Sequence, residues 1–344
     1  MQPSTPMAAV AALLCLGLSA CSSASKPAAA PVDATGASSS APAATAPAAG
    51  LQAALVHVAA TVDPSVVLIQ TTAGLGSGVV LDTQGDIVTN NHVAAAGTSP
   101  TVVTPDGHQA PATLLGSFAP DDLAVLRVKG LPLKPASFAD SSKLTQGDIV
   151  MAVGNPLGLQ TTVSEGIVSA VGRMVPEPGG STILNAIQTT AAINPGNSGG
   201  ALANLDGKVV GIPTVAATDP QLGGAAVGIG FAIPANTVTD IAGQIVRDGK
   251  VTNSHRGYLG VTAADILPPI GVLVFSVQPG GPAGAAGIKP GDVITGVDGK
   301  PVTSSQELNE LVAGLAPGQK VSVAITHADG STATVTVTVG QYPG

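Results

Sequence analysis

The sequence predicts a mainly β protein, and its composition and the spacing of its apolar runs both indicate this. Glycine and proline are abundant among the 344 residues, at 44 and 28, whereas charged residues make up only 10%. This composition suits short strands joined by tight turns and does not favour long, charged surface helices. Short apolar runs also follow one another without regularly alternating helices. We therefore expect an all-β sandwich or barrels, and not a parallel sheet with crossover helices.

The expected elements are apolar runs bounded by Gly, Pro or Asp. A short helix is predicted between Leu51 and Pro64. Strands are predicted at 65–70, 76–81, 86–90, 101–104, 123–128, 148–153, 162–171, 208–215 and 227–233. Aromatic residues are only 2% and Trp is absent, so the core must consist of Val, Ile, Leu and Ala.

The first 50 residues predict an export segment and a tether. Met7–Ala20 is almost wholly apolar and too short to span a bilayer. It ends in Leu18-Ser19-Ala20-Cys21, which resembles the lipobox of bacterial lipoproteins, where the cysteine becomes lipidated. Residues 1–21 are therefore predicted to be a lipoprotein-type signal peptide with Cys21 lipidated, the alternative being an ordinary cleaved signal. Residues 22–50, rich in Ala, Ser and Pro, are predicted to be a disordered tether.

Charge and cysteine content exclude several functions. Both cysteines, Cys15 and Cys21, lie in the export segment, which excludes a disulfide framework, a thiol nucleophile and a Cys-ligated metal in the folded body. A net charge of −8 without Lys/Arg clusters argues against a nucleic-acid partner. Neither a metal nor another cofactor is expected. Four histidines without a partner pattern are predicted to be surface or structural residues: His57, His108, His255 and His327.

One serine in a run of glycines carries the chemistry. Ser198 lies in Gly196-Asn197-Ser198-Gly199-Gly200, downstream of His92 and of the adjacent pair Asp121 and Asp122. A serine hydroxyl becomes nucleophilic at neutral pH when a base is in reach and an acid orients that base. The glycines allow backbone N–H groups to converge where an oxyanion develops.

The same five residues match the nucleophile elbow of α/β-hydrolases, which predicts a different fold. An elbow serine precedes a helix, and its acid and histidine follow it in sequence. Here the motif is followed by strand, Asp206-Gly207 turn and strand, and the later histidines lie in a separate module. The order His92, Asp122, Ser198 is instead that of chymotrypsin-like double β-barrels.

Six motifs in this order resemble the HtrA (Deg) family of trypsin-like serine proteases. The similarity runs from about Leu51 to Val339. The motifs are Gly76-Ser77-Gly78, Thr89–Val93, Asp122–Leu126, Gly154-Asn155-Pro156, Ala192–Gly200 and Gly228–Pro234.

The resemblance implies a trypsin-like protease domain over residues 51–250, with the catalytic triad between two barrels. It makes His92 the general base, Asp122 its orienting acid and Ser198 the nucleophile. Backbone N–H groups of Gly196, Asn197 and Ser198 are implied to line the oxyanion hole. Asp121 is the competing acid, but the family motif places the acid directly before Leu-Ala.

The chain departs from the family pattern at two positions, and a third position bears on specificity. Thr190 stands where the family usually has Asp, and Ala201 where Pro is common. In trypsin-like barrels the residue six before the nucleophile floors the S1 pocket. Here it is Ala192, with Ile229 and Phe231 nearby, so small or medium apolar P1 residues are expected. The alternative is that the pocket loops differ enough for this position to be uninformative.

A second module over 255–340 resembles a PDZ domain. The carboxylate-binding loop is assigned to Tyr258, Leu259, Gly260 and Val261, and 287–302 resembles another recurring PDZ stretch. Ser304–Glu307 predicts a capping box opening a helix, with closing strands at 320–325 and 332–339. The resemblance implies that a peptide adds as a strand beside Val261. The alternative is a PDZ fold used only as a rigid brace.

These features lead to one functional expectation and one rival. The expectation is an exported, lipid-anchored or otherwise secreted, ATP-independent serine endopeptidase of the bacterial cell envelope. It would act on misfolded or specific envelope proteins and bind unfolded or C-terminal peptides. The family resemblance implies a homotrimer, and the short segment between Thr71 and Gly76 indicates a regulated protease and not a large cage. The rival is a PDZ-bearing scaffold or holdase with a latent protease domain.

Overall fold

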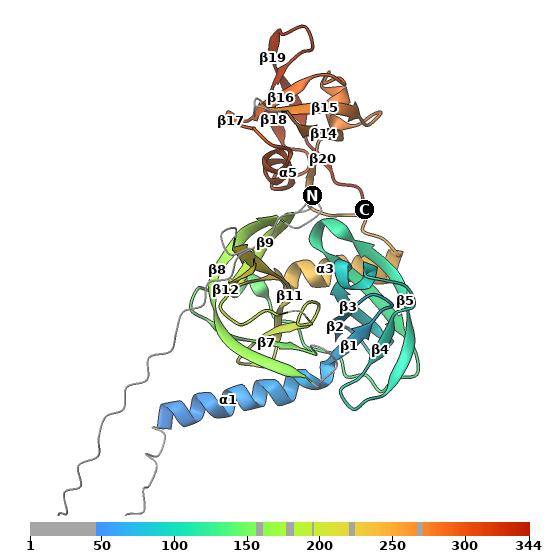
Figure 1. The fold of residues 1–344 in the computed structure, drawn as a ribbon, viewed down its shortest axis with the longest axis vertical. Coiled ribbons are helices and arrows are strands. Elements are labelled where there is room, and N and C mark those ends of the chain that lie inside the picture. The colour runs from blue at the N-terminus through green and yellow to red at the C-terminus, as the bar shows by residue number, and fades with distance from the viewer. Residues whose placement is uncertain (1–45, 156–160, 177–181, 195, 220–223, 267–270) are drawn as a thin grey trace, which may run out of the picture. The chain divides into compact units, whose positions relative to one another are not determined.

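The computed structural model describes residues 46–344 except 156–160, 177–181, 195, 220–223 and 267–270. Two closed six-stranded barrels are followed by a PDZ domain, which confirms the predicted mainly β class (Figure 1). The predicted signal peptide, Cys21 and nearly all of the predicted tether lie outside the described residues.

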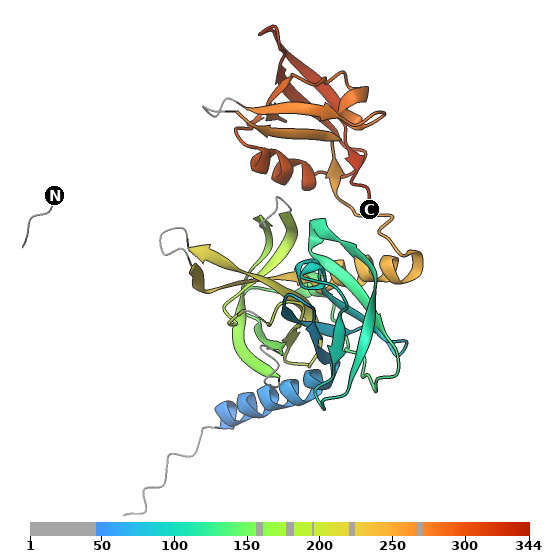
Figure 2. The same ribbon diagram turned by 45° about the vertical axis from the view of Figure 1, so that its right-hand side comes forward.

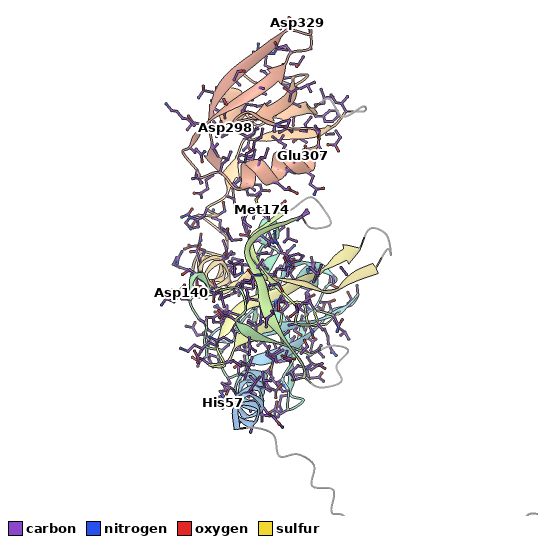
Figure 3. All side chains as sticks on the ribbon, turned by 90° about the vertical axis from the view of Figure 1, so that its left-hand side faces the viewer. His57, Asp140, Met174, Asp298, Glu307 and Asp329 are labelled. Carbon is purple, nitrogen blue, oxygen red and sulfur yellow. The ribbon has the colours of Figure 1, made fainter. Side chains whose placement is uncertain are left out.

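Helix α1 (Ala46–Val62) begins five positions before the Leu51 start that the sequence predicted. The alanines favour a helix. Pro47 in the first turn is compatible with one because the N–H that proline lacks would have no intrahelical partner at that position. Val58 and Val62 are buried against the barrels, whereas His57 is exposed (Figure 3). The short 3-10 helix η1 (Asp63–Ser65) follows. Within the described residues, no helix is both long and apolar enough to cross a membrane.

The first barrel has the strand order β1-β2-β3-β6-β5-β4. Its strands are β1 (Val66–Gln70), β2 (Leu75–Val80), β3 (Asp86–Asn90), β4 (Thr101–Val103), β5 (Gln109–Phe118) and β6 (Leu123–Val128). The short helices α2 (Asn91–Ala95) and η2 (Ala119–Asp121) follow β3 and β5. Strand β5 was not among the predicted runs because its residues are mostly exposed or half-buried.

An ion pair between a buried carboxylate and a half-buried guanidinium fixes the register of β3 against β6. Asp86 is directly opposite Arg127, and its fully buried carboxylate accepts two hydrogen bonds from the guanidinium, at 2.6 and 2.7 Å. A bidentate pair of this kind is geometrically specific, and shifting the ladder would leave a buried charge unpaired. The same register places Asn90 opposite Leu123, so the chain leaves β3 beside the point where it enters β6.

The second barrel has the strand order β10-β11-β12-β9-β8-β7. Its strands are β7 (Ile149–Gly154), β8 (Thr162–Pro176), β9 (Thr182–Thr189), β10 (Ala201–Asn204), β11 (Val209–Asp219) and β12 (Gly224–Pro234). The 3-10 helix η3 (Ser141–Lys143) precedes it, and Asp140, its N-cap residue, is labelled in Figure 3. β10 and β11 form the predicted hairpin after Ser198, with Asp206-Gly207 in the turn.

Helix α3 (Ala235–Asp248) packs on strands of both barrels, and the sequence analysis did not predict it. Val238, Ile241, Ala242 and Ile245 form one buried face at helical spacing. This face packs on β5, β6 and β11, so a helix that follows the second barrel covers strands of the first (Figure 2). Gly249 ends the helix in the left-handed conformation, with φ 71°.

The PDZ domain has its own buried core and a sheet in the order β14-β15-β16-β18-β19, with β17 paired to β16. Its strands are β13 (Gly257–Tyr258), β14 (Val261–Asp265), β15 (Val272–Val277), β16 (Val293–Val297), β17 (Lys300–Pro301), β18 (Lys320–Thr326), β19 (Thr332–Thr338) and β20 (Gly340–Gln341). β13 pairs with β20, and the helices are α4 (Pro282–Ala285) and α5 (Ser305–Ala313).

The predicted capping box opens α5 with one change of partner. The Ser304 side chain accepts a hydrogen bond from the Glu307 N–H at 3.2 Å. The Glu307 carboxylate, labelled in Figure 3, accepts from the N–H of Thr303 at 2.7 Å, one residue before the N-cap. Both contacts satisfy N–H groups at the helix entrance.

Ile212 provides a test of the core that both barrels share, because it is fully buried there. Ile212→Ala in the Ser198→Ala background is expected to destabilise the protease domain by about 2–5 kcal/mol, through lost burial and a residual cavity. Denaturant unfolding followed by far-UV circular dichroism measures this. Leu205→Ala, at an exposed position, is the control and is expected to stay within about 0.5 kcal/mol of its parent.

Candidate active site

His92 and Asp122 lie close together because both are within two residues of the end of the β3–β6 pairing, at Asn90 and Leu123. His92 is the second residue of α2, which directly follows β3, and Asp122 directly precedes β6. The imidazole Nδ1 lies 2.8 Å from Asp122 Oδ2, and the backbone N–H of His92 donates to Oδ1 at 2.9 Å. The carboxylate therefore holds both the backbone and the ring of the histidine. The His92 side chain remains 47% exposed, whereas that of Asp122 is 3% exposed.

Asp122 has an uncommon backbone conformation. Its φ is 49°, in the left-handed region that Asp tolerates better than most residues. Its carbonyl accepts hydrogen bonds from Asn91 N at 3.0 Å and from the Asn90 side chain at 3.1 Å. The peptide and the carboxylate are thus both held by the segment that carries His92.

Thr214 on β11 links the acid to the serine, and the sequence analysis missed it. Its hydroxyl donates to Asp122 Oδ2 at 2.7 Å, and its carbonyl accepts a hydrogen bond from Ser198 Oγ at 2.8 Å. Thr214 therefore contacts two of the three predicted triad residues. In this conformation the Ser198 proton points at a backbone carbonyl, so it must be redirected before a base can remove it.

The nucleophile turn is built on glycines in places that a side chain would fill. Gly199 has φ 80°, and a Cβ on it would lie 2.2 Å from the Ser77 carbonyl oxygen. A Cβ on Gly154, at the end of β7, would lie 2.6 Å from Asn197 Oδ1. Gly196 has φ 100°, which only glycine adopts readily. The motif thus allows the turn to pack against both barrels.

The backbone geometry corrects the predicted oxyanion hole. The N–H of Asn197 donates to Asn194 O at 3.0 Å and is turned into the loop, so it does not face a reacting oxyanion. The Asn197 carbonyl accepts from Gly200 N at 2.9 Å. Because a trans peptide directs its carbonyl and the following N–H to opposite sides, this contact turns the N–H of Ser198 away from the loop. Gly196 and Ser198 are the two candidate donors that remain.

Thr190, which stands where an Asp is usual, forms neutral contacts. Its hydroxyl accepts from Ile167 N at 3.0 Å, and its N–H donates to Ile167 O at 3.1 Å. These bonds connect the segment before Ala192 to β8, and none of them involves a charged group as an Asp at this position would. Ala201 lies fully buried at the start of β10, opposite Val153.

The predicted S1 residues differ in their surroundings. Ala192 is exposed, and its carbonyl accepts from Asn197 Nδ2 at 3.1 Å, which ties it to the nucleophile turn. Ile229 is 37% exposed, and Phe231 packs partly buried against the core shared by the barrels.

Asp121, the competing acid, forms a buried ion pair with Arg256. Arg256 precedes β13, and its second guanidinium nitrogen donates to the Thr182 carbonyl at 2.6 Å. Burial raises the pKa of the Asp121 carboxyl above its usual value, and the positive charge of Arg256 opposes that rise. Arg256, which leads into the PDZ domain, therefore holds Asp121, the residue next to the candidate catalytic acid Asp122.

The predicted carboxylate loop borders a cavity of about 470 Å³, whose lining also includes Ala119, Pro120 and Thr182 of the protease domain. It is lined by Tyr258, Leu259, Gly260, Val261, Leu308 and Val312, among others. The carbonyls of Leu259 and Gly260 accept from Ala283 N and Gln278 N, both at 2.8 Å. By the planarity of the peptide, this turns the N–H groups of Gly260 and Val261 to the other side. β14 is an edge strand of the sheet, as strand addition requires.

Aromatic rings gather next to this loop. The ring of Tyr342 packs edge-to-face on Tyr258 with centroids 5.5 Å apart, and on Phe118 with centroids 6.2 Å apart. Tyr342 is held in place by hydrogen bonds of its N–H to Arg256 O and of Ser254 Oγ to its carbonyl, at 2.9 and 2.8 Å. Phe118 is buried, and it precedes the η2 turn that leads to Asp122.

Two barrels with an imidazole, a carboxylate and a hydroxyl at their junction define a trypsin-like serine protease. The family description "Trypsin-like peptidase domain" matches residues 76–212, and "PDZ domain" matches residues 245–339. The chain belongs to the HtrA (Deg) family of serine proteases, as the resemblance predicted.

Named relatives and solved structures support this assignment. The chain is 40% identical over 309 residues to the serine protease PepD of Mycobacterium tuberculosis (83% of this chain, 66% of PepD). It is 40% identical over 282 residues to the serine endoprotease DegS of Escherichia coli K12 (78% of this chain, 77% of DegS). The HtrA-type protease AlgW with a decapeptide superposes with a TM-score of 0.60 at 32% identity, covering 84% of this chain and 99% of that one. A serine endoprotease from Yersinia pestis gives a TM-score of 0.59 at 36% identity, covering 83% and 97%.

Thr214→Val tests the link between the acid and β11. The substitution removes the hydroxyl that donates to the Asp122 carboxylate and keeps the side-chain shape. A hydrogen bond to a charged group contributes about 1.5–3 kcal/mol, so kcat/KM is expected to fall by roughly 10- to 100-fold. Steady-state hydrolysis of a chromogenic peptide measures it. Thr214→Ser retains the hydroxyl and is expected to stay near wild type; equal activity of the Val and Ser variants would contradict the role.

Proposed function

We propose that this chain is an HtrA-type serine endopeptidase in which Ser198, His92 and Asp122 form the catalytic triad. The observation that carries the proposal is the carboxylate of Asp122, which accepts hydrogen bonds from His92 Nδ1 and from Thr214. With Nδ1–H bound to the acid, Nε2 is the ring nitrogen that can act as the base.

The reaction follows from this geometry. Ser198 Oγ turns from the Thr214 carbonyl and attacks the scissile carbonyl carbon, while its proton passes to His92 Nε2. The N–H groups of Gly196 and Ser198 stabilise the oxyanion. The imidazolium then protonates the leaving amine as the C–N bond breaks. A water molecule deprotonated by His92 attacks the acyl-enzyme, which releases the acid and restores Ser198.

We further propose cleavage after small or medium apolar residues. Ala192 brings no carboxylate to the position that floors the S1 pocket in trypsin-like barrels, so a basic P1 side chain would have no partner there. Ile229 and Phe231 would supply the apolar contacts.

The PDZ groove supports binding of unfolded or C-terminal peptides. The edge strand β14 offers main-chain hydrogen bonds, the N–H groups of Gly260 and Val261 would hold a terminal carboxylate, and the Leu308 and Val312 side chains favour an apolar last residue. AlgW, a structural neighbour, is described with a bound decapeptide and with a bound tripeptide.

An extracytoplasmic location is also part of the proposal. Homologues of 40% and 38% identity are named probable periplasmic serine endoproteases. The lipobox-like sequence ending at Cys21 would anchor the protease to the membrane, with residues 22–45 as part of a spacer. A homotrimer that degrades misfolded or specific envelope proteins completes the proposal.

One observation favours the alternative of a latent protease domain on a PDZ-bearing scaffold or holdase. The Ser198 hydroxyl is directed at the Thr214 carbonyl, which is a resting and not a reacting orientation. The presence of His92, Asp122 and Ser198 together favours the endopeptidase over this alternative.

Hydrolysis of unfolded β-casein by residues 46–344, wild type against Ser198→Ala, tests the endopeptidase. We expect cleavage by wild type and its loss in the variant, because the nucleophile is gone. Fragment mass spectra give the P1 residues, which are expected to be small or apolar. Failure of wild type to cleave, even with C-terminal peptides added, would support the latent scaffold.

Arg256→Ala tests coupling between the PDZ domain and the catalytic acid. It removes both guanidinium contacts, to Asp121 beside the catalytic acid and to Thr182. We expect the change in kcat that a C-terminal peptide causes in wild type to be lost. Arg247→Ala, at an exposed arginine, is the matched control and should respond as wild type does. An unaltered response in Arg256→Ala would leave the PDZ domain as a brace.

A further inference from the structure

We infer that Ser77 is a positioning residue for the oxyanion hole, through a hydroxyl that ties the nucleophile turn to both barrels. This inference rests on the proposed role of Ser198 and extends it to a residue on β2 that does not touch substrate. Ser77 is the middle residue of Gly76-Ser77-Gly78, which marks the family resemblance but has no part in the triad chemistry.

The Ser77 side chain makes two hydrogen bonds inside the molecule. Its Oγ donates to the Gly196 carbonyl at 2.6 Å and accepts from the N–H of Asn155 at 2.8 Å. Ser77 is fully buried, so water does not substitute readily for either bond. Three segments far apart in sequence thus meet at one oxygen atom: β2, the end of β7 and the nucleophile turn.

The Ser77 backbone holds the same turn a second time. Its N–H donates to the Ser198 carbonyl at 2.9 Å, and its own carbonyl accepts from Thr89 Oγ1 at 2.7 Å. Gly199 packs so closely on the Ser77 carbonyl that a Cβ has no room. The carbonyls of Gly196 and Ser198 are therefore both bound by one residue of the first barrel.

These contacts fix the peptide planes around the predicted donors. The unit joining Gly196 and Asn197 is held at its carbonyl by Ser77 and at its N–H by Asn194 O. With that plane fixed, the two backbone torsions of Gly196, of which φ is 100°, set the direction of the Gly196 N–H. Without the hydroxyl this plane can rotate, and the Gly196 N–H leaves the position where the oxyanion forms.

Only a group that both donates and accepts can serve here. Alanine would leave a buried carbonyl and a buried N–H without the shared partner, and cysteine is a weak donor and acceptor with a larger atom. Local relaxation of the glycine turn relieves these unsatisfied groups more easily than unfolding of either barrel does. The loss is therefore expected in transition-state stabilisation more than in global stability.

The test compares Ser77→Ala, Ser77→Cys and Ser77→Thr with wild type in residues 46–344. Each is assayed for kcat and KM on a chromogenic peptide and for inhibition by a peptide boronic acid, whose tetrahedral serine adduct mimics the oxyanion. We expect Ser77→Ala and Ser77→Cys to lower kcat by about 10- to 100-fold with KM within about twofold. Boronate affinity should weaken in parallel, and the acidic limb of the pH–rate profile should stay in place because His92 is untouched.

Ser65→Ala is the matched control, a buried serine in η1 that is outside the nucleophile turn, and should keep wild-type kcat. Ser77→Thr keeps the hydroxyl and is expected to recover most of the loss; thermal melts identify any variant that fails to fold. A folded Ser77→Ala with wild-type kcat and boronate affinity overturns the inference. So does a loss confined to KM. Failure of the proposed function looks different, because it leaves wild type inactive or Ser198→Ala active.

Discussion

The apolar core shared by the two barrels is the constraint on which the active site depends. Val66 and Leu123 from the first barrel, Ile212 from the second and Ile241 from α3 all lie in one buried cluster. No bond within a single barrel could bring Ser198 to His92, because the two residues belong to different barrels. The burial of this cluster fixes one barrel against the other, and the polar contacts of the site then set the fine geometry.

The polar contacts at the junction act in series. The Asp86–Arg127 pair sets the register that brings His92 beside Asp122. Thr214 on β11 then links the Asp122 carboxylate to Ser198. Ser77 then ties the nucleophile turn back to the first barrel. The carboxylates of Asp86 and Asp122 and the hydroxyls of Thr214 and Ser77 are buried, so leaving their bonds unmade would be costly. These contacts join the two barrels directly at the site.

The features that the sequence analysis missed include contacts between residues far apart in the sequence. The all-β class and the hairpin after Ser198 follow from local patterns, whereas the double barrel and the PDZ domain followed from the family resemblance. These predictions were confirmed. Thr214 and Ser77 lie 16 and 119 positions from their partners, Ser198 and Gly196, and no periodicity reveals such contacts. The oxyanion prediction included Asn197 because residue type says nothing about the direction of an N–H. Helix α3 was missed because its β-branched residues resemble those of strands, and the start of α1 because alanine and proline also characterise tethers.

The aromatic contacts near the carboxylate loop have a spectroscopic consequence. The chain has no Trp, and its two tyrosines, Tyr258 and Tyr342, are in contact with each other. Ultraviolet emission of the whole protein therefore arises at one spot, where the carboxylate loop, the C-terminal segment and Phe118 converge. The barrels contribute almost no light of their own. Intrinsic fluorescence of this protein reports the surroundings of the predicted carboxylate loop and is almost insensitive to the protease core.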